Sequence, residues 1–122
     1  MKLMIVDDSL IIRNKINRTL LSRFSKVCRA ENGQQAIDMA ALERPNVVTM
    51  DLTMPEVDGV EAIERIMAIA PETHILVISA LADKATAIKA LSLGANGFLC
   101  KPFTQKELSS AIERIIEIEL SK

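Results

Sequence analysis

Five polar residues in this sequence each follow a short apolar run, and their side chains are of the kinds that hold a cation and a phosphoryl group. Asp7 and Asp8 follow residues 3–6, Asp51 follows residues 47–50, Ser79 follows residues 75–78, and Lys101 follows residues 97–100. Three clustered carboxylates repel one another unless a cation joins them. A ligand set made only of oxygen favours a hard ion such as Mg²⁺.

The charges of these side chains predict a site that is receptive to phosphate. Three aspartates, one Mg²⁺ and Lys101 sum to zero, so a phosphoryl group is not repelled. Asp51 can act as a nucleophile and form an acyl phosphate, while Lys101 binds its oxygens as a point charge and the Ser79 hydroxyl donates a hydrogen bond. Taken singly, such residues are usually a helix cap, a turn serine and a solvated lysine. Their joint placement favours the functional interpretation.

The elements that position these residues alternate along the chain. Buried strands are predicted at residues 3–6, 26–30, 47–50, 75–78 and 97–100, and helices at residues 9–23, 34–43, 60–70, 84–93 and 105–120. Ser9, Asp83 and Thr104 are the predicted helix caps. Strands that alternate with helices imply a parallel sheet covered on both faces. The carboxyl ends of its strands, and the polar residues after them, then share one edge.

Composition predicts a single cytoplasmic domain over residues 1–122, with 49% apolar residues and a net charge of −1. That charge gives no bulk reason to expect nucleic acid as a partner, and no apolar run is long enough for membrane insertion. Cys28 and Cys100 lie in apolar runs and are predicted to be buried free thiols. His74, the single histidine, precedes a strand and is predicted to lie at the surface.

The chain closely resembles the receiver domain of two-component response regulators, especially the single-domain chemotaxis type. The matching residues are Asp7-Asp8, residues 51–55 with Asp58-Gly59, Ser79-Ala80 and residues 101–103. The resemblance implies an α/β, flavodoxin-like, doubly wound five-stranded parallel sheet of order 2-1-3-4-5 with five helices. It also implies a cis peptide bond between Lys101 and Pro102.

The resemblance implies a role for each site residue. Asp51 is the expected phosphoacceptor, and Asp8, Asp51 and the Thr53 backbone carbonyl are the expected Mg²⁺ ligands, with Asp7 reaching the ion through water. Ser79 and Lys101 form the phosphate-sensing pair, and Ser79 and Phe98 form the switch. Phe98 lacks the hydroxyl that many relatives carry there. Thr53 and Leu81 flank the expected path of attacking water, where Leu81 could slow dephosphorylation.

The predicted function is a phosphoaspartate switch that is not an enzyme beyond its own phosphorylation and autodephosphorylation. The donor is a histidine kinase or a histidine phosphotransfer protein. Phosphorylation changes affinity for a downstream target protein, or for a second copy in a phosphorylation-dependent homodimer. The face used is built from the fourth helix, fifth strand and fifth helix.

Three other interpretations stay open at this point. A phosphatase of the haloacid dehalogenase type needs a second acid two residues after the nucleophile, where this chain has Thr53. A flavodoxin-like nucleotide binder needs a phosphate loop where Asp7 and Asp8 stand. The chain could also be the receiver half of a larger DNA-binding or enzymatic regulator. Its start at Met1 and its end within a helix favour a stand-alone protein.

Two helices carry predicted interaction surfaces. Seven basic residues oppose two acids in residues 1–30, and in the first helix Leu10 and Ile11 lie off the buried stripe. Arg13, Lys15 and Arg18 flank them, which predicts a docking face for the donor. The apolar residues of the last helix cover an arc of roughly 200°, wider than a core-facing stripe needs. Ile116, Ile118 and Leu120 are therefore predicted to contact a partner.

Overall fold

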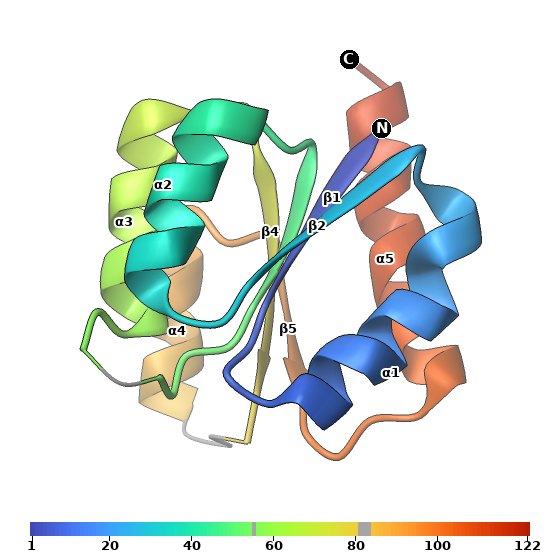
Figure 1. Cartoon of the computed structure of the whole chain (residues 1–122), viewed down its shortest axis with the longest axis horizontal. Helices are drawn as coiled ribbons and strands as arrows, with labels where there is room; N and C mark the ends of the chain where they lie inside the picture. Colours follow the sequence, from blue (N-terminus) through green and yellow to red (C-terminus); the bar gives the residue numbers. More distant parts are fainter. Residues whose placement is uncertain (55, 81–83) are drawn as a thin grey trace.

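The computed structural model describes residues 1–54, 56–80 and 84–122, in which strands and helices alternate (Figure 1). Pro55 of the matching motif, Leu81 and the predicted cap Asp83 lie outside the described residues. A 3-10 turn, Leu21–Arg23, extends the first helix. The strands are β1 (Lys2–Val6), β2 (Lys26–Ala30), β3 (Val47–Met50), β4 (His74–Ser79) and β5 (Gly97–Cys100). The helices are α1 (Leu10–Leu20), α2 (Gly33–Glu43), α3 (Gly59–Ile69), α4 (Lys84–Ser92) and α5 (Gln105–Leu120).

The five strands form one parallel sheet in the order β2-β1-β3-β4-β5, which confirms the predicted fold class. α1 and α5 cover one face of the sheet, and α2, α3 and α4 cover the other (Figure 1). The strand order changes direction between β1 and β3. In open α/β sheets, ligands bind beyond the carboxyl ends of the strands at such a point.

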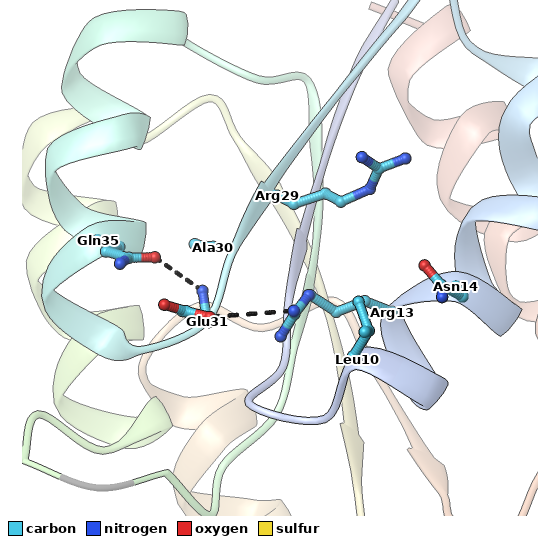
Figure 2. A pocket seen from close by; sticks show the side chains of 7 residues that line it. All are labelled: Leu10, Arg13, Asn14, Arg29, Ala30, Glu31 and Gln35. Atoms are coloured by element: carbon cyan, nitrogen blue, oxygen red, sulfur yellow. Dashed lines mark hydrogen bonds and ion pairs between the residues drawn. The ribbon is translucent and has the colours of Figure 1, made fainter.

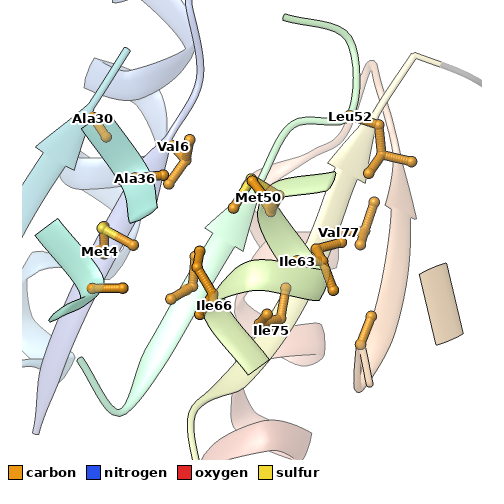
Figure 3. Close-up of a cluster of buried hydrophobic side chains, with 14 of the residues drawn as sticks. Met4, Val6, Ala30, Ala36, Met50, Leu52, Ile63, Ile66, Ile75 and Val77 are labelled. Carbon is orange, nitrogen blue, oxygen red and sulfur yellow. The ribbon is translucent and has the colours of Figure 1, made fainter. Parts of the chain in front are cut away.

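Side chains on the central strands divide the core into two apolar layers. On β1, Met4 and Val6 pack toward α2 and α3, whereas Leu3 and Ile5 pack toward α1 and α5. This alternation follows from the two-residue repeat of a strand. Figure 3 shows the first layer, in which Ile63 and Ile66 of α3 lie over the sheet. With both faces covered, every residue of β3 is buried.

Capping side chains begin the helices close to the strand ends. The hydroxyl of Ser9 accepts a hydrogen bond from the Ile12 N–H at 3.3 Å, and Thr104 forms a capping box with Glu107. Asn32 and Asp58, predicted only as turn residues, also cap α2 and α3. Each cap satisfies an N–H that the first helical turn leaves unpaired.

His74 is buried, so its predicted surface position is wrong. Its Nε2 atom lies 2.7 Å from Glu119 Oε2 near the end of α5, and the side chain is 9% exposed. Asn46 donates a hydrogen bond to the other Glu119 oxygen at 3.3 Å. Burial raises the pKa of Glu119, but the hydrogen bonds from Lys122, Asn46 and His74 outweigh it and lower that pKa. These contacts join the last turn of α5 to the amino ends of β3 and β4.

Three further burial predictions need correction. Cys100 is exposed and Cys28 is only half-buried, although both are free thiols as predicted. β5 is an edge strand, which explains why an apolar run there leaves a side chain in solvent. Ile116 is 3% exposed and belongs to the core, whereas Ile118 and Leu120 are 47% and 72% exposed. Among the described residues, no helix combines the length and the apolarity needed to cross a membrane.

Candidate functional site

The sheet brings the residues predicted for the site to one edge. Asp7 directly follows β1, Asp51 follows β3, Ser79 ends β4 and Lys101 follows β5. Backbone hydrogen bonds continue the sheet through this edge. The Asp51 N–H donates to the Val6 carbonyl at 3.0 Å, and the Lys101 N–H donates to the Ser79 carbonyl at 2.9 Å. The backbone at these positions is therefore held by the sheet itself.

Asp7, Asp8 and Asp51 form the acidic centre of this edge. One oxygen from each of the three carboxylates lies within 4.8 Å of the other two. Asp7 and Asp51 are 1% and 3% exposed, while Asp8 is open to solvent. Two buried carboxylates beside one exposed carboxylate suit an ion that keeps several of its waters, as Mg²⁺ does. The acidic pocket is thus compatible with Mg²⁺.

Lys101 supplies the positive charge that the acidic pocket needs. Its Nζ atom donates a hydrogen bond to Asp7 Oδ2 at 2.7 Å and lies 3.6 Å from Asp51 Oδ2. The Lys101–Pro102 peptide bond is cis, as the resemblance implied. The ammonium bridges two of the three carboxylates, so a cation that enters the pocket competes with it for the same oxygens.

Asp51 is electrostatically perturbed. Burial is the main cause that raises its pKa, and the negative charge of Asp7 raises it further. The Lys101 ammonium and a hydrogen bond from the Thr53 N–H to Asp51 Oδ1, at 3.2 Å, act in the opposite direction. The charged form of Asp51 is therefore only partly compensated by the protein. A divalent cation beside it would favour that charged form.

The remaining predicted residues surround this centre at different depths. Ser79 is fully buried on β4, and Thr53 is exposed in the loop after Asp51. Phe98 is half-buried on β5, where it pairs in register with Val77 of β4. Leu81 lies outside the described residues. The structure thus gathers the carboxylates and Lys101 by direct contacts, and it places Ser79 at the end of the adjacent strand.

Arg13 and Gly59 support the backbone of the pocket, a role that was not predicted for either of them. Arg13 was predicted to flank an exposed docking face, but its side chain is only 11% exposed, so that prediction is wrong for this residue. The Arg13 guanidinium donates a hydrogen bond to the Asp7 backbone carbonyl at 2.6 Å. A Cβ atom on Gly59 would lie 2.1 Å from the Asp51 carbonyl oxygen, so only glycine allows α3 to start against the end of β3. The sequence analysis placed Arg13 away from the buried stripe of the first helix, and an amino-acid sequence does not show that an arginine pairs with a backbone carbonyl.

Lys15 differs from its predicted role on the docking face. Its ammonium donates a hydrogen bond to the Phe103 carbonyl at 2.5 Å and lies 4.4 Å from the centre of the Phe103 ring. Lys15 is therefore engaged with the loop between β5 and α5. Arg18, in contrast, is exposed in the last turn of α1.

Comparison with known proteins places the chain among receiver domains. The family described as the response regulator receiver domain matches residues 3–113. The chemotaxis protein CheY of Listeria monocytogenes is 37% identical over 115 residues, covering 93% of this chain and 97% of that protein. The protein-glutamate methylesterase/protein-glutamine glutaminase of Colwellia psychrerythraea is 39% identical over 128 residues, covering 96% of this chain but 33% of the longer protein. The receiver domain of AraT from Geobacillus stearothermophilus superposes with a TM-score of 0.90 at 28% identity, covering 98% and 95% of the two chains.

The fold and its acidic pocket define a doubly wound α/β protein with a cation-compatible pocket at the carboxyl ends of its strands. The chain belongs to the response regulator receiver domain family, and it is similar to chemotaxis proteins of nearly its own length. It is thus a receiver domain of two-component signalling, which confirms the resemblance drawn from the sequence.

Proposed function

We propose that residues 1–122 form one receiver domain in which Asp51 accepts a phosphoryl group from the phosphohistidine of a kinase or phosphotransfer protein. The observation that carries this proposal is the contact set of Lys101, whose ammonium lies 2.7 Å from Asp7 and 3.6 Å from Asp51. An ammonium in this position can bind a phosphoryl oxygen on Asp51 without leaving the pocket. In the reaction, an Asp51 oxygen bonds to phosphorus while the donor's nitrogen–phosphorus bond breaks.

The acidic residues hold the cation that this chemistry needs. Asp8, Asp51 and the Thr53 backbone carbonyl are the proposed direct ligands of Mg²⁺, and Asp7 contacts the ion through water. When bound, Mg²⁺ neutralises charge on the transferred phosphoryl group. Asp7 has a second task, because its carboxylate holds the Lys101 ammonium and accepts a hydrogen bond from the Ser9 N–H at 2.9 Å. The remaining catalytic work is positioning and charge stabilisation.

Phosphorylation is proposed to change the face formed by α4, β5 and α5. The Ser79 hydroxyl donates to a phosphoryl oxygen, and the Phe98 ring, now half-buried, turns inward. The Phe98 side chain packs against the layer that includes Ala90 of α4 and Ala95, and residue 98 also lines a groove with Arg114 and Ile118 of α5. A movement of the ring would therefore change packing beside α4 at the face that α4, β5 and α5 form. A downstream target protein or a second copy of this chain binds there.

The methylesterase match favours one further candidate, in which this chain is the receiver part of a longer regulator. The chain spans only 33% of that relative. The phosphoacceptor chemistry is the same in both cases, and the receiver turns over only its own phosphoryl group. The intact open reading frame distinguishes them.

The proposal is tested by incubating the protein with Mg²⁺ and acetyl phosphate and then measuring its intact mass. We expect one phosphoryl adduct on the unchanged protein and none on Asp51→Asn. The matched control is Asp38→Asn, which changes an exposed acid on α2 and should keep the adduct. No adduct on the unchanged protein, or an adduct that survives Asp51→Asn, would overturn the assignment.

A further inference from the structure

Arg13 is a nearly buried arginine that the proposed phosphorylation chemistry does not use. It lies in the second turn of α1, and its side chain is only 11% exposed. One guanidinium nitrogen donates a hydrogen bond to the Asp7 carbonyl at 2.6 Å. The other terminal nitrogen lies 4.0 Å from Glu31 Oε2, in the loop between β2 and α2. Figure 2 shows Arg13 reaching from α1 across the groove toward Glu31.

The Asp7 carbonyl lies just beyond the backbone groups that the sheet pairs, because the Asp7 N–H still donates a hydrogen bond to the Ala30 carbonyl of β2 at 3.1 Å. The Val6 carbonyl still accepts a hydrogen bond from the Asp51 N–H at 3.0 Å. The chain then leaves the sheet at the peptide unit that joins Asp7 to Asp8. Asp7 is 1% exposed, and a buried carbonyl is nearly always paired. Arg13 supplies that partner and so fixes the plane of the peptide between two of the three carboxylates.

We propose that Arg13 is a positioning residue for the cation site, because it holds the Asp7–Asp8 peptide so that both carboxylates face Asp51. The inference rests on the function proposed above. Arg13 binds a backbone carbonyl, in contrast to Lys101, which contacts the carboxylates themselves. Arg13 therefore restrains the loop after β1 without contacting the carboxylate oxygens that would bind Mg²⁺. Groups that orient metal ligands in this way typically contribute roughly 10–100-fold to metal affinity.

Electrostatics and positioning predict opposite results when Arg13 is replaced. Removing a positive charge close to a cation site reduces repulsion, so charge alone would make Mg²⁺ bind more tightly. Loss of the bond to the Asp7 carbonyl would release the loop and make Mg²⁺ bind more weakly. The sign of the change in affinity therefore separates the two explanations.

Arg29 offers a matched control in the same groove. It lies on β2 and lines the groove together with Arg13 and Gln35. Figure 2 shows its guanidinium directed away from Glu31. Arg29→Met therefore removes the same charge and keeps a similar apolar stem, but it leaves the bond between Arg13 and Asp7 in place.

The test is calorimetric titration of Mg²⁺ into the unchanged protein, Arg13→Met, Arg29→Met and Arg13→Lys, with the melting temperature of each recorded in EDTA. We expect Arg13→Met to bind Mg²⁺ about tenfold more weakly. Arg29→Met should bind it equally or slightly more tightly. Arg13→Lys, which keeps one donor, should lie between the unchanged protein and Arg13→Met. If Arg13→Met does not fold, the comparison of Arg13→Lys with Arg29→Met decides in the same way.

Equal affinities for the Arg13 and Arg29 variants, or tighter binding by Arg13→Met, would overturn the positioning role. Such results would leave the proposed function intact if the unchanged protein still binds Mg²⁺ and forms the Asp51 adduct. A saturating Mg²⁺ concentration should restore the adduct rate of Arg13→Met with acetyl phosphate. A rate that stays low at saturation would also overturn the inference, because the defect would then not lie in cation binding.

Discussion

Asp51 carries a charge that the folded protein without a cation accommodates poorly. Burial first, and the neighbouring Asp7 second, raise its pKa above the ordinary value of 3.8. Because the folded pKa is the higher one, ionisation costs folding free energy as the pH rises from 3.8 through the folded value. The cost is fully present above the folded pKa and absent well below 3.8. At neutral pH the ionised Asp51, the form that can act as a nucleophile, therefore lowers the stability of the folded protein.

Asp51→Asn should therefore unfold at a higher denaturant concentration than the unchanged protein at neutral pH in EDTA. The difference should shrink as the pH is lowered through the folded pKa, since both side chains are then neutral. Mg²⁺ at about a hundredfold excess over its Kd should stabilise the unchanged protein by about 2.7 kcal/mol and the variant by much less. Urea titrations at several pH values measure all three effects. A variant less stable than the unchanged protein at neutral pH without metal would contradict this account of Asp51.

α1 presents two faces with different tasks. Ile16 and Leu20 are buried against the sheet, whereas Leu10 and Ile11 are 61% and 79% exposed. These two apolar residues begin the helix directly after the loop that carries Asp8. Arg18 is exposed on the same helix. An apolar patch beside the pocket with a flanking positive charge suits a partner that brings a phosphorylated, acidic surface to Asp51.

Arg18→Glu should slow phosphotransfer from a protein donor by about tenfold, because it reverses the charge that steers the donor to this face. Phosphorylation by acetyl phosphate should not change. Stopped-flow or quenched-flow measurement with both donors gives the comparison, and Arg65→Glu on α3, also exposed, is the control. Lys15 is unsuitable for this purpose because its ammonium is bonded to the Phe103 carbonyl. Equal slowing with both donors would show that the damage lies in the pocket.

Much of the fold and of the candidate site could be predicted from the positions in the sequence where the apolar runs end. Parallel strands all point the same way, so Asp7, Asp51 and Lys101 had to share an edge once the strands were recognised. The fold class and the gathering of the acidic pocket were therefore predictable. The start of each helix was predictable to within one residue, helped at α1 and α5 by the strong capping side chains of Ser9 and Thr104. The first helix was predicted to reach Arg23, but α1 ends at Leu20 and a 3-10 turn covers Leu21–Arg23.

The errors arise where a residue's surroundings come from distant parts of the chain. His74 is buried because Glu119, 45 residues later, reaches it from α5. Cys100 is exposed because β5 has a neighbour on one side only. The partner of Arg13 is a backbone carbonyl, and every residue has one, so no residue type in the sequence indicates this pairing. Tertiary contacts of these kinds cannot be read from local periodicity.

α5 shows how one helix serves both the core and the surface of the molecule. Ile115 and Ile116 are 2% and 3% exposed and pack in the layer with α1. Ile118 is 47% exposed and lines the groove that contains Phe98. The apolar arc of α5 is therefore wider than the part that packs in the core, and the exposed Ile118 lies beside Phe98 of the proposed switch.

Ile118→Lys should leave the adduct on Asp51 intact but abolish phosphate-dependent association with a target or a second copy. Its free energy of unfolding should change by no more than about 0.5 kcal/mol, as is usual at exposed positions. Ile116→Lys is the matched control and should lose about 3–5 kcal/mol, because it buries an unpaired charge. Sedimentation with and without acetyl phosphate measures association, and urea unfolding measures stability. Should Ile118→Lys lose several kcal/mol, or associate as the unchanged protein does, Ile118 would not belong to the output face.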